Sequence, residues 1–300
     1  MKWIKHLSGA LLLAVAVPAA AALNIFACEP EWGALAKELG GDKVAVFTAT
    51  TALQDPHHIE ARPSLIARAR SAELMVCTGA QLEIGWLPLL LTQSGNARIQ
   101  LGRPGYFEAA DYVARIELPQ VLDRSLGDVH PAGNPHLHLD PHNIVKVAQA
   151  LTQRLAVLDP ANTEYYRAQS KQFLARWQEA IARWEKQGSG LRDLPIVIHH
   201  KNLSYFIRWL KLREVGALEP RPGIPPSAGH LGELLARLQK QPAKAVVRAA
   251  YNDPRPAEWL AERAKIPVIA VPFTVGGSDK AKDLFGLFDD TLARLLAVVK

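Results

Sequence analysis

The chain has 300 residues, 49% of them hydrophobic, and 35 Lys and Arg against 29 Asp and Glu give it a formal charge of +6. This length and apolar content suit one large domain or two medium lobes with a real hydrophobic core. The two signs of charge are mixed along the chain, which excludes the basic stripe typical of a nucleic-acid-binding protein.

The N-terminus has the features of an export signal. Two lysines precede an apolar run over Leu7–Val17, and Ala20–Ala22 supply an A-x-A cleavage pattern. We therefore predict a cleavable signal peptide over residues 1–22 and a periplasmic mature protein. The run is too short to span a bilayer, which disfavours the alternative of a retained anchor. A lipoprotein would need Cys28 at the cleavage point, and Cys28 lies too far from the apolar run.

Strands and helices alternate in residues 23–158, which we expect to form the N-terminal α/β lobe. Gly40 and Gly41 end its first predicted helix, and Asp140-Pro141 has the signature of an N-cap followed by proline at the first helical position. The elements predicted here are strands over Leu23–Cys28, Lys43–Thr48 and Glu73–Cys77, and helices over Glu31–Leu39, Pro63–Arg70 and Pro141–Leu158.

One long helix is predicted next. Residues Ala161–Gln187 contain no Gly or Pro, and aromatic side chains such as Trp177 and Trp184 recur at helical spacing, which is typical of core packing. At about 1.5 Å per residue, this helix would form a rod of roughly 40 Å. We assign residues 159–188 to a linking helix between two lobes.

Residues 189–300 alternate again and form the predicted C-terminal α/β lobe. Its elements are strands over Leu194–Ile198, Ala243–Val247 and Pro267–Val271, and helices over Leu203–Leu210, Ala228–Gln239, Pro256–Ala264 and Lys280–Val299. Strands that alternate with helices favour parallel sheets. The predicted fold class is therefore α/β: two lobes with parallel β-sheets flanked by helices, joined by one long rigid helix.

The two cysteines of the chain, Cys28 and Cys77, each lie at the end of a predicted strand. In an oxidising compartment they could form a disulfide across adjacent strand ends, and two buried free thiols are the alternative. Their spacing is not C-x-x-C, which argues against a thiolate zinc site.

Histidines carry the predicted chemistry. The chain has ten, and apart from His6 in the signal and the isolated His230, they fall in three clusters. These are His57 and His58; His130, His136, His138 and His142; and His199 and His200. Two clusters follow predicted strands and one precedes a helix, and ligands of open α/β sheets bind beyond the carboxyl ends of strands. We expect all three clusters to face one cleft.

Neutral imidazoles suit zinc, copper, nickel and iron, and a histidine site without carboxylates favours Zn²⁺ over Mn²⁺.

H-E-x-x-H is absent, which excludes the common zinc-protease helix. The run from His136 to His142 is similar to the H-x-H-x-D-H motif of metallo-β-lactamase-like hydrolases. It has one residue too many, and Asp140 is better explained as a helix cap.

Five short pieces of sequence occur in order along the chain. They are Asp55-Pro56-His57-His58 with Arg62-Pro63-Ser64; Gly79 with Leu82-Glu83 and Trp86; Asn134-Pro135-His136 with Leu139-Asp140-Pro141; His200 with Tyr205-Phe206; and Pro222-Gly223-Ile224-Pro225-Pro226-Ser227. Each piece is weak, but the ordered set resembles the zinc/manganese solute-binding proteins of bacterial metal ABC transporters, the zinc-uptake binding proteins of the cell adhesion family.

The resemblance implies two α/β lobes bridged by a long helix, and metal ligands at His57, His136 and His200. It implies a monomer that captures a divalent transition metal and delivers it to an ABC-transporter permease, and no catalysis. His58, His138 and His199 are then expected to line the cleft or to hydrogen-bond the ligands. A zinc-dependent hydrolase, a periplasmic metallochaperone and a binder of metal chelates are the alternatives.

The fourth ligand is left open. His138 stands where the family usually has an aromatic residue, and Thr274 takes the place of the acidic ligand that many members carry near the C-terminus. The candidates for the fourth position are Asp279, Glu60, His58 and water.

Overall fold

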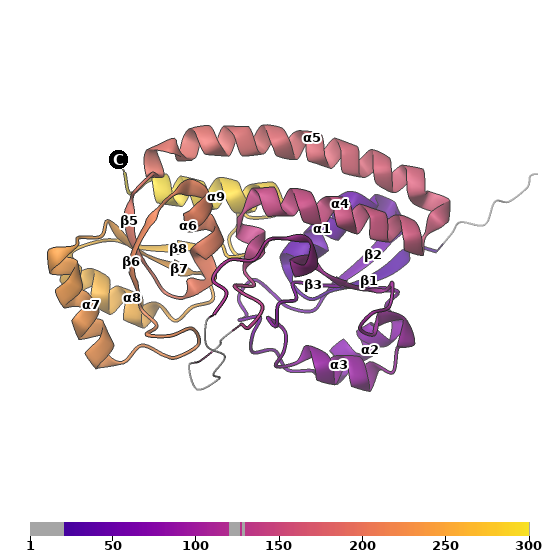
Figure 1. The fold of residues 1–300 in the computed structure, drawn as a ribbon, viewed down its shortest axis with the longest axis horizontal. Coiled ribbons are helices and arrows are strands. Elements are labelled where there is room, and N and C mark those ends of the chain that lie inside the picture. The colour runs from indigo at the N-terminus through magenta and orange to yellow at the C-terminus, as the bar shows by residue number, and fades with distance from the viewer. Residues whose placement is uncertain (1–20, 120–126, 128–129, 300) are drawn as a thin grey trace, which may run out of the picture.

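The computed structural model describes residues 21–119, 127 and 130–299, so most of the predicted signal peptide lies outside the described residues. Two four-stranded parallel sheets, one in each half of the chain, lie side by side under a single helix, α5 (Thr163–Gly188), which runs along both (Figure 1). This arrangement confirms the predicted fold class. No helix within the described residues has the length and apolar character needed to cross a membrane.

The N-terminal sheet has the strand order β2-β1-β3-β4, and all its pairings are parallel. Its strands are β1 (Leu23–Ala27), β2 (Val44–Thr48), β3 (Leu74–Cys77) and β4 (Tyr106–Glu108), and the helices of this half are α1 (Pro30–Gly40), α2 (Pro63–Ser71), α3 (Leu87–Ser94) and α4 (Pro141–Leu158). All four residues of β3 are buried, as expected for a parallel strand that is covered on both faces.

The C-terminal sheet repeats the same topology with the order β6-β5-β7-β8. Its strands are β5 (Pro195–Ile198), β6 (Arg213–Ala217), β7 (Ala245–Ala249) and β8 (Val268–Val271), and its helices are α6 (Ser204–Leu210), α7 (Ala228–Lys240), α8 (Pro254–Ala264) and α9 (Leu284–Leu296). In both sheets the chain order reverses at the central strand, and the carboxyl ends there are where ligands bind in open α/β folds.

Helix α5 joins the two halves through a shared core. It packs against α1 and α4 of the first half and against α9 of the second. Trp177 stacks on Phe173 and meets Phe285 and Phe288 edge-on, while its indole Nε1 donates to the Pro141 carbonyl at 2.9 Å. Because one apolar cluster crosses from lobe to lobe beneath α5, large hinge motions would expose it to water.

Two helix starts predicted from the sequence, Pro141 and Ala228, are confirmed as the first residues of α4 and α7. Asp140 accepts from the His142 amide at 2.9 Å to cap α4, and Ser227 accepts from the His230 amide at 3.2 Å to cap α7. Three short elements, α3, β4 and β6, were not predicted, and the final helix α9 is shorter than the predicted Lys280–Val299. The three missed elements have three to eight residues, too few for a clear hydrophobic period.

Of the two expectations for the cysteines, the structure has the disulfide between Cys28 and Cys77. Both residues are fully buried and lie at the carboxyl ends of the paired strands β1 and β3. Buried Glu29 and Glu83 lie beside this bridge, and burial raises the pKa of both carboxyl groups, that of Glu83 to about 7.

Candidate metal centre

Three histidines from distant parts of the chain converge between the lobes. His57 lies in the loop between β2 and α2, His136 just before α4, and His200 two residues beyond the end of β5. One ring nitrogen of each lies within 4.8 Å of one ring nitrogen of the other two, and all three residues are buried. The shared cleft expected for the three clusters is therefore present for these members.

His136 is the most unusual of the three. Its side chain is 1% exposed, yet neither Nδ1 nor Nε2 has a hydrogen-bond partner among the described residues. Burial and the neighbouring His57 and His200 lower the pKa of His136 well below the usual value, so its imidazole is neutral and carries a lone pair. A buried polar ring without a partner is costly in a folded protein and indicates a position where a ligand binds.

The rings of His57 and His200 each contact a carboxylate through Nδ1, the nitrogen next to the ring's attachment point. His57 Nδ1 lies 2.7 Å from Asp55 Oδ1, and His200 Nδ1 lies 2.7 Å from Glu219 Oε2. Burial alone would raise the pKa of Asp55, but its hydrogen bonds with His57 and the charge of that ring outweigh burial and lower the pKa to about 2. A carboxylate that accepts from Nδ1–H leaves the lone pair on Nε2, the usual arrangement of a metal-ligating histidine.

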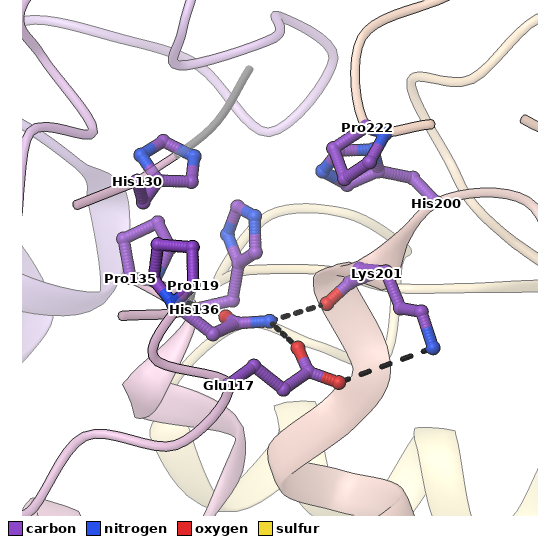
Figure 2. A pocket seen from close by; sticks show the side chains of 9 residues that line it. Glu117, Pro119, His130, Pro135, His136, His200, Lys201 and Pro222 are labelled. Carbon is purple, nitrogen blue, oxygen red and sulfur yellow. Dashed lines mark hydrogen bonds and ion pairs between the residues drawn. The ribbon is translucent and has the colours of Figure 1, made fainter. Parts of the chain in front are cut away.

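A fourth imidazole, His130, lies beside this group and contacts His57. Its Nε2 lies 3.2 Å from Nε2 of His57, and it lines a cavity of about 250 Å³ together with His136 and His200 (Figure 2). Burial and the nearby His57 and His200 lower the pKa of His130 to about 3. The sequence placed His130 in a histidine cluster but gave no reason to single it out.

The loop that carries His136 is tied to both lobes by Asn134. Its side-chain oxygen accepts from the His136 amide at 2.9 Å, and its Nδ2 donates to Glu117 and to the Lys201 carbonyl, both at 2.8 Å. The Tyr205 hydroxyl donates to the Asn134 carbonyl at 2.9 Å. These hydrogen bonds give a physical reason for the Asn in the Asn134-Pro135-His136 motif and for the Tyr five residues after His200.

The protein groups named for the fourth position are exposed. Within the described residues the group of three buried histidines includes none of Asp279, Glu60 and His58, and it does not include His130 either. The ring of His58 lies 6.1 Å from that of His57, between ring centroids. Thr274 is buried, but its hydroxyl donates to Glu31.

The expected neighbours His138 and His199 contact carboxylates. His138 Nδ1 lies 3.1 Å from Glu31 and its Nε2 lies 2.9 Å from the Phe273 carbonyl, so this ring connects α1 of the N-terminal half to the loop after β8. His199 Nε2 lies 3.7 Å from Glu219. His138 therefore takes part in a buried contact between the lobes.

Comparison with known proteins places this geometry in a family. Residues 25–298 match the family model described as ZnuA, zinc-uptake complex component A, periplasmic. The chain belongs to this ZnuA family.

Two relatives that carry other names are similar to this chain over most of their length. ScbA of Streptococcus cristatus, a metal ABC transporter substrate-binding lipoprotein, is 23% identical over 270 residues, which cover 87% of this chain and 83% of ScbA. PsaA of Streptococcus pneumoniae, a manganese ABC transporter substrate-binding lipoprotein, is 22% identical over 249 residues, which cover 80% of this chain and 76% of PsaA.

Solved structures share the fold. A crystal structure of ZnuA superposes with a TM-score of 0.76 at 22% identity, covering 91% of this chain and 99% of its own. The Mn-bound periplasmic metal-binding protein of Candidatus Liberibacter asiaticus gives a TM-score of 0.74 at 16% identity, covering 93% and 100%. The ZnuA-family chain described here is thus a metal-binding substrate-binding protein of an ABC transporter and not an enzyme, which removes the hydrolase alternative.

Proposed function

We propose that this protein captures Zn²⁺ in the periplasm through His57, His136 and His200 and delivers it, as a monomer, to an ABC-transporter permease. The observation that carries the proposal is the buried His136 ring. It has no hydrogen-bond partner in the part of the chain that the structure describes, and it lies between two imidazoles that each contact a carboxylate. Imidazole nitrogen suits zinc, whereas manganese prefers oxygen ligands. The group of three contains no carboxylate, which favours zinc over the manganese named for PsaA.

Export through a cleavable signal is part of this proposal. The relatives ScbA and PsaA are named lipoproteins. Here Cys28 is fully buried and bonded to Cys77, so its sulfur is not available for lipid attachment. This supports cleavage near Ala22 over a lipid anchor on Cys28.

The proposal is tested by metal titration of the purified, metal-free protein at neutral pH. We expect one Zn²⁺ per chain and a higher melting temperature with zinc, since a ligand bound only by the native state stabilises it by about 2.7 kcal/mol at 100 times its Kd. Manganese at the same concentration should give a much smaller shift. An equal or larger shift with Mn²⁺ would contradict the zinc assignment, and no shift with either ion would contradict metal capture at this site.

The carboxylates behind the ligands should matter for affinity. We expect Asp55→Asn and Glu219→Gln each to weaken zinc binding by roughly 10- to 100-fold, the usual cost of losing a carboxylate behind a ligating histidine. Competition with a chelating dye measures this change. Glu214→Gln, which alters a C-lobe carboxylate bonded to Lys201 at 2.6 Å, serves as the matched control and should leave affinity unchanged. Equal losses in all three variants would indicate a general structural effect.

A further inference from the structure

Three imidazoles leave one position of a tetrahedral zinc site unfilled. Two nitrogens on the same tetrahedral zinc, each about 2.05 Å from the metal, are about 3.3 Å apart. The Nε2 atoms of His57 and His130 are 3.2 Å apart, which is close to this value. Two ring nitrogens that face each other at this distance are placed as a pair of ligands on one ion would be.

The other nitrogen of the His57 ring is already engaged, because Nδ1 lies 2.7 Å from Asp55 Oδ1. When one ring nitrogen is held by an oxygen acceptor, the lone pair resides on the other. The Asp55 contact therefore leaves the lone pair of His57 on Nε2, the atom that faces His130 Nε2.

We propose that His130 is the fourth metal ligand, so that the site holds its ion with four imidazoles and no carboxylate. This inference rests on the proposed function and deepens it by naming the class of metal. A site of four nitrogens takes zinc or a similar nitrogen-preferring divalent ion and discriminates against Mn²⁺, which prefers oxygen.

The positions of the rings define how the ion is enclosed. The ring centroid of His57 lies 5.2, 5.3 and 5.7 Å from those of His130, His136 and His200, so His57 is the central member. His130 and His136 are wider apart, at 6.4 Å. Coordination by all four rings therefore requires His130 to move toward His136.

Charge balance fits the same assignment. Four neutral imidazoles leave the two positive charges of the ion uncompensated, and an isolated buried charge is unfavourable. The carboxylates of Asp55 and Glu219, one behind His57 and one behind His200, supply two negative charges without touching the metal. The carboxylate nearest to the cavity, Glu117, is instead engaged by Asn134 at 2.8 Å and by Ser204 at 3.0 Å.

The test compares the wild-type protein with His130→Ala, and His58→Ala is the matched control, since His58 is the exposed neighbour of His57. X-ray absorption of the zinc-loaded proteins counts the imidazoles on the metal. We expect four in the wild type and in His58→Ala, and three plus an oxygen in His130→Ala. The His130→Ala variant should bind zinc at least about tenfold more weakly, because the loss of a group that only hydrogen-bonds a metal ligand already weakens binding by about that factor. The preference of this variant for Zn²⁺ over Mn²⁺ should also be smaller than that of the wild type.

Chemical rescue separates coordination from folding. Adding free imidazole to His130→Ala should restore the four-nitrogen spectrum, because the deleted ring leaves space in the cavity of about 250 Å³. A wild-type protein that binds zinc through three imidazoles only, with a spectrum and affinity unchanged in His130→Ala, would overturn the assignment of His130. That result would leave the proposed function intact, whereas a wild-type protein that binds no metal would overturn the function itself.

Discussion

Replacing His136 by leucine should remove zinc binding while leaving the metal-free protein at least as stable as the wild type. The imidazole is 1% exposed and neither ring nitrogen has a hydrogen-bond partner within residues 21–119, 127 and 130–299, so its polar atoms make no stabilising contact there. An unsatisfied buried polar atom costs about 1–3 kcal/mol, and a leucine of similar size avoids this cost. We expect the loss of zinc affinity to exceed the roughly 10- to 100-fold caused by changes at the carboxylates behind the other rings.

Two measurements check this prediction together. Thermal unfolding of metal-free His136→Leu should give a melting temperature equal to or above that of the wild type, and zinc should no longer raise it. His230→Ala is the control, since that ring donates to the Ala217 carbonyl at 3.0 Å and lies outside the histidine group. A strong loss of stability in metal-free His136→Leu would show that the ring has a structural role instead.

The second large expected effect concerns Trp177 of α5, which packs between the two lobes. We expect Trp177→Ala to lower the free energy of unfolding by about 3–5 kcal/mol, the usual cost of deleting a buried tryptophan. Trp177 is fully buried and contacts Phe285 and Phe288 of α9 as well as the Pro141 carbonyl at the start of α4. Typical proteins are stable by only 5–15 kcal/mol, so this loss is a large part of the total.

Because Trp177 contacts elements of both lobes, its removal should destabilise them together. Differential scanning calorimetry should show one transition, shifted downward by roughly 6–20 °C. Gln178→Ala, at the exposed neighbouring position of the same helix, should change stability by no more than about 0.5 kcal/mol. Two separate transitions, only one of them shifted, would contradict a core shared between the lobes.

The sequence by itself determined the elements whose signals are local. Helix α5 was predicted because no Gly or Pro interrupts it, and α4 because Asp140 and Pro141 mark its start. Capping and hydrophobic period depend on residues within a few positions of one another, so they can be read along the chain. The same logic placed the histidine clusters at strand and loop ends, and the ordered motifs selected His57, His136 and His200.

Only the tertiary structure decided what surrounds these rings. Glu219 binds His200 from 19 residues away, and His130 meets His57 across 73 residues, with no spacing that would reveal either contact. Glu219 meets His200 because β5 and β6 pair in parallel and end at the same edge of the C-terminal sheet. His57 and His130 meet because two distant loops of the N-terminal half fold onto the same place. Contacts of this kind depend on strand pairing and loop packing, which are set by the sum of many burial terms and not by a local pattern.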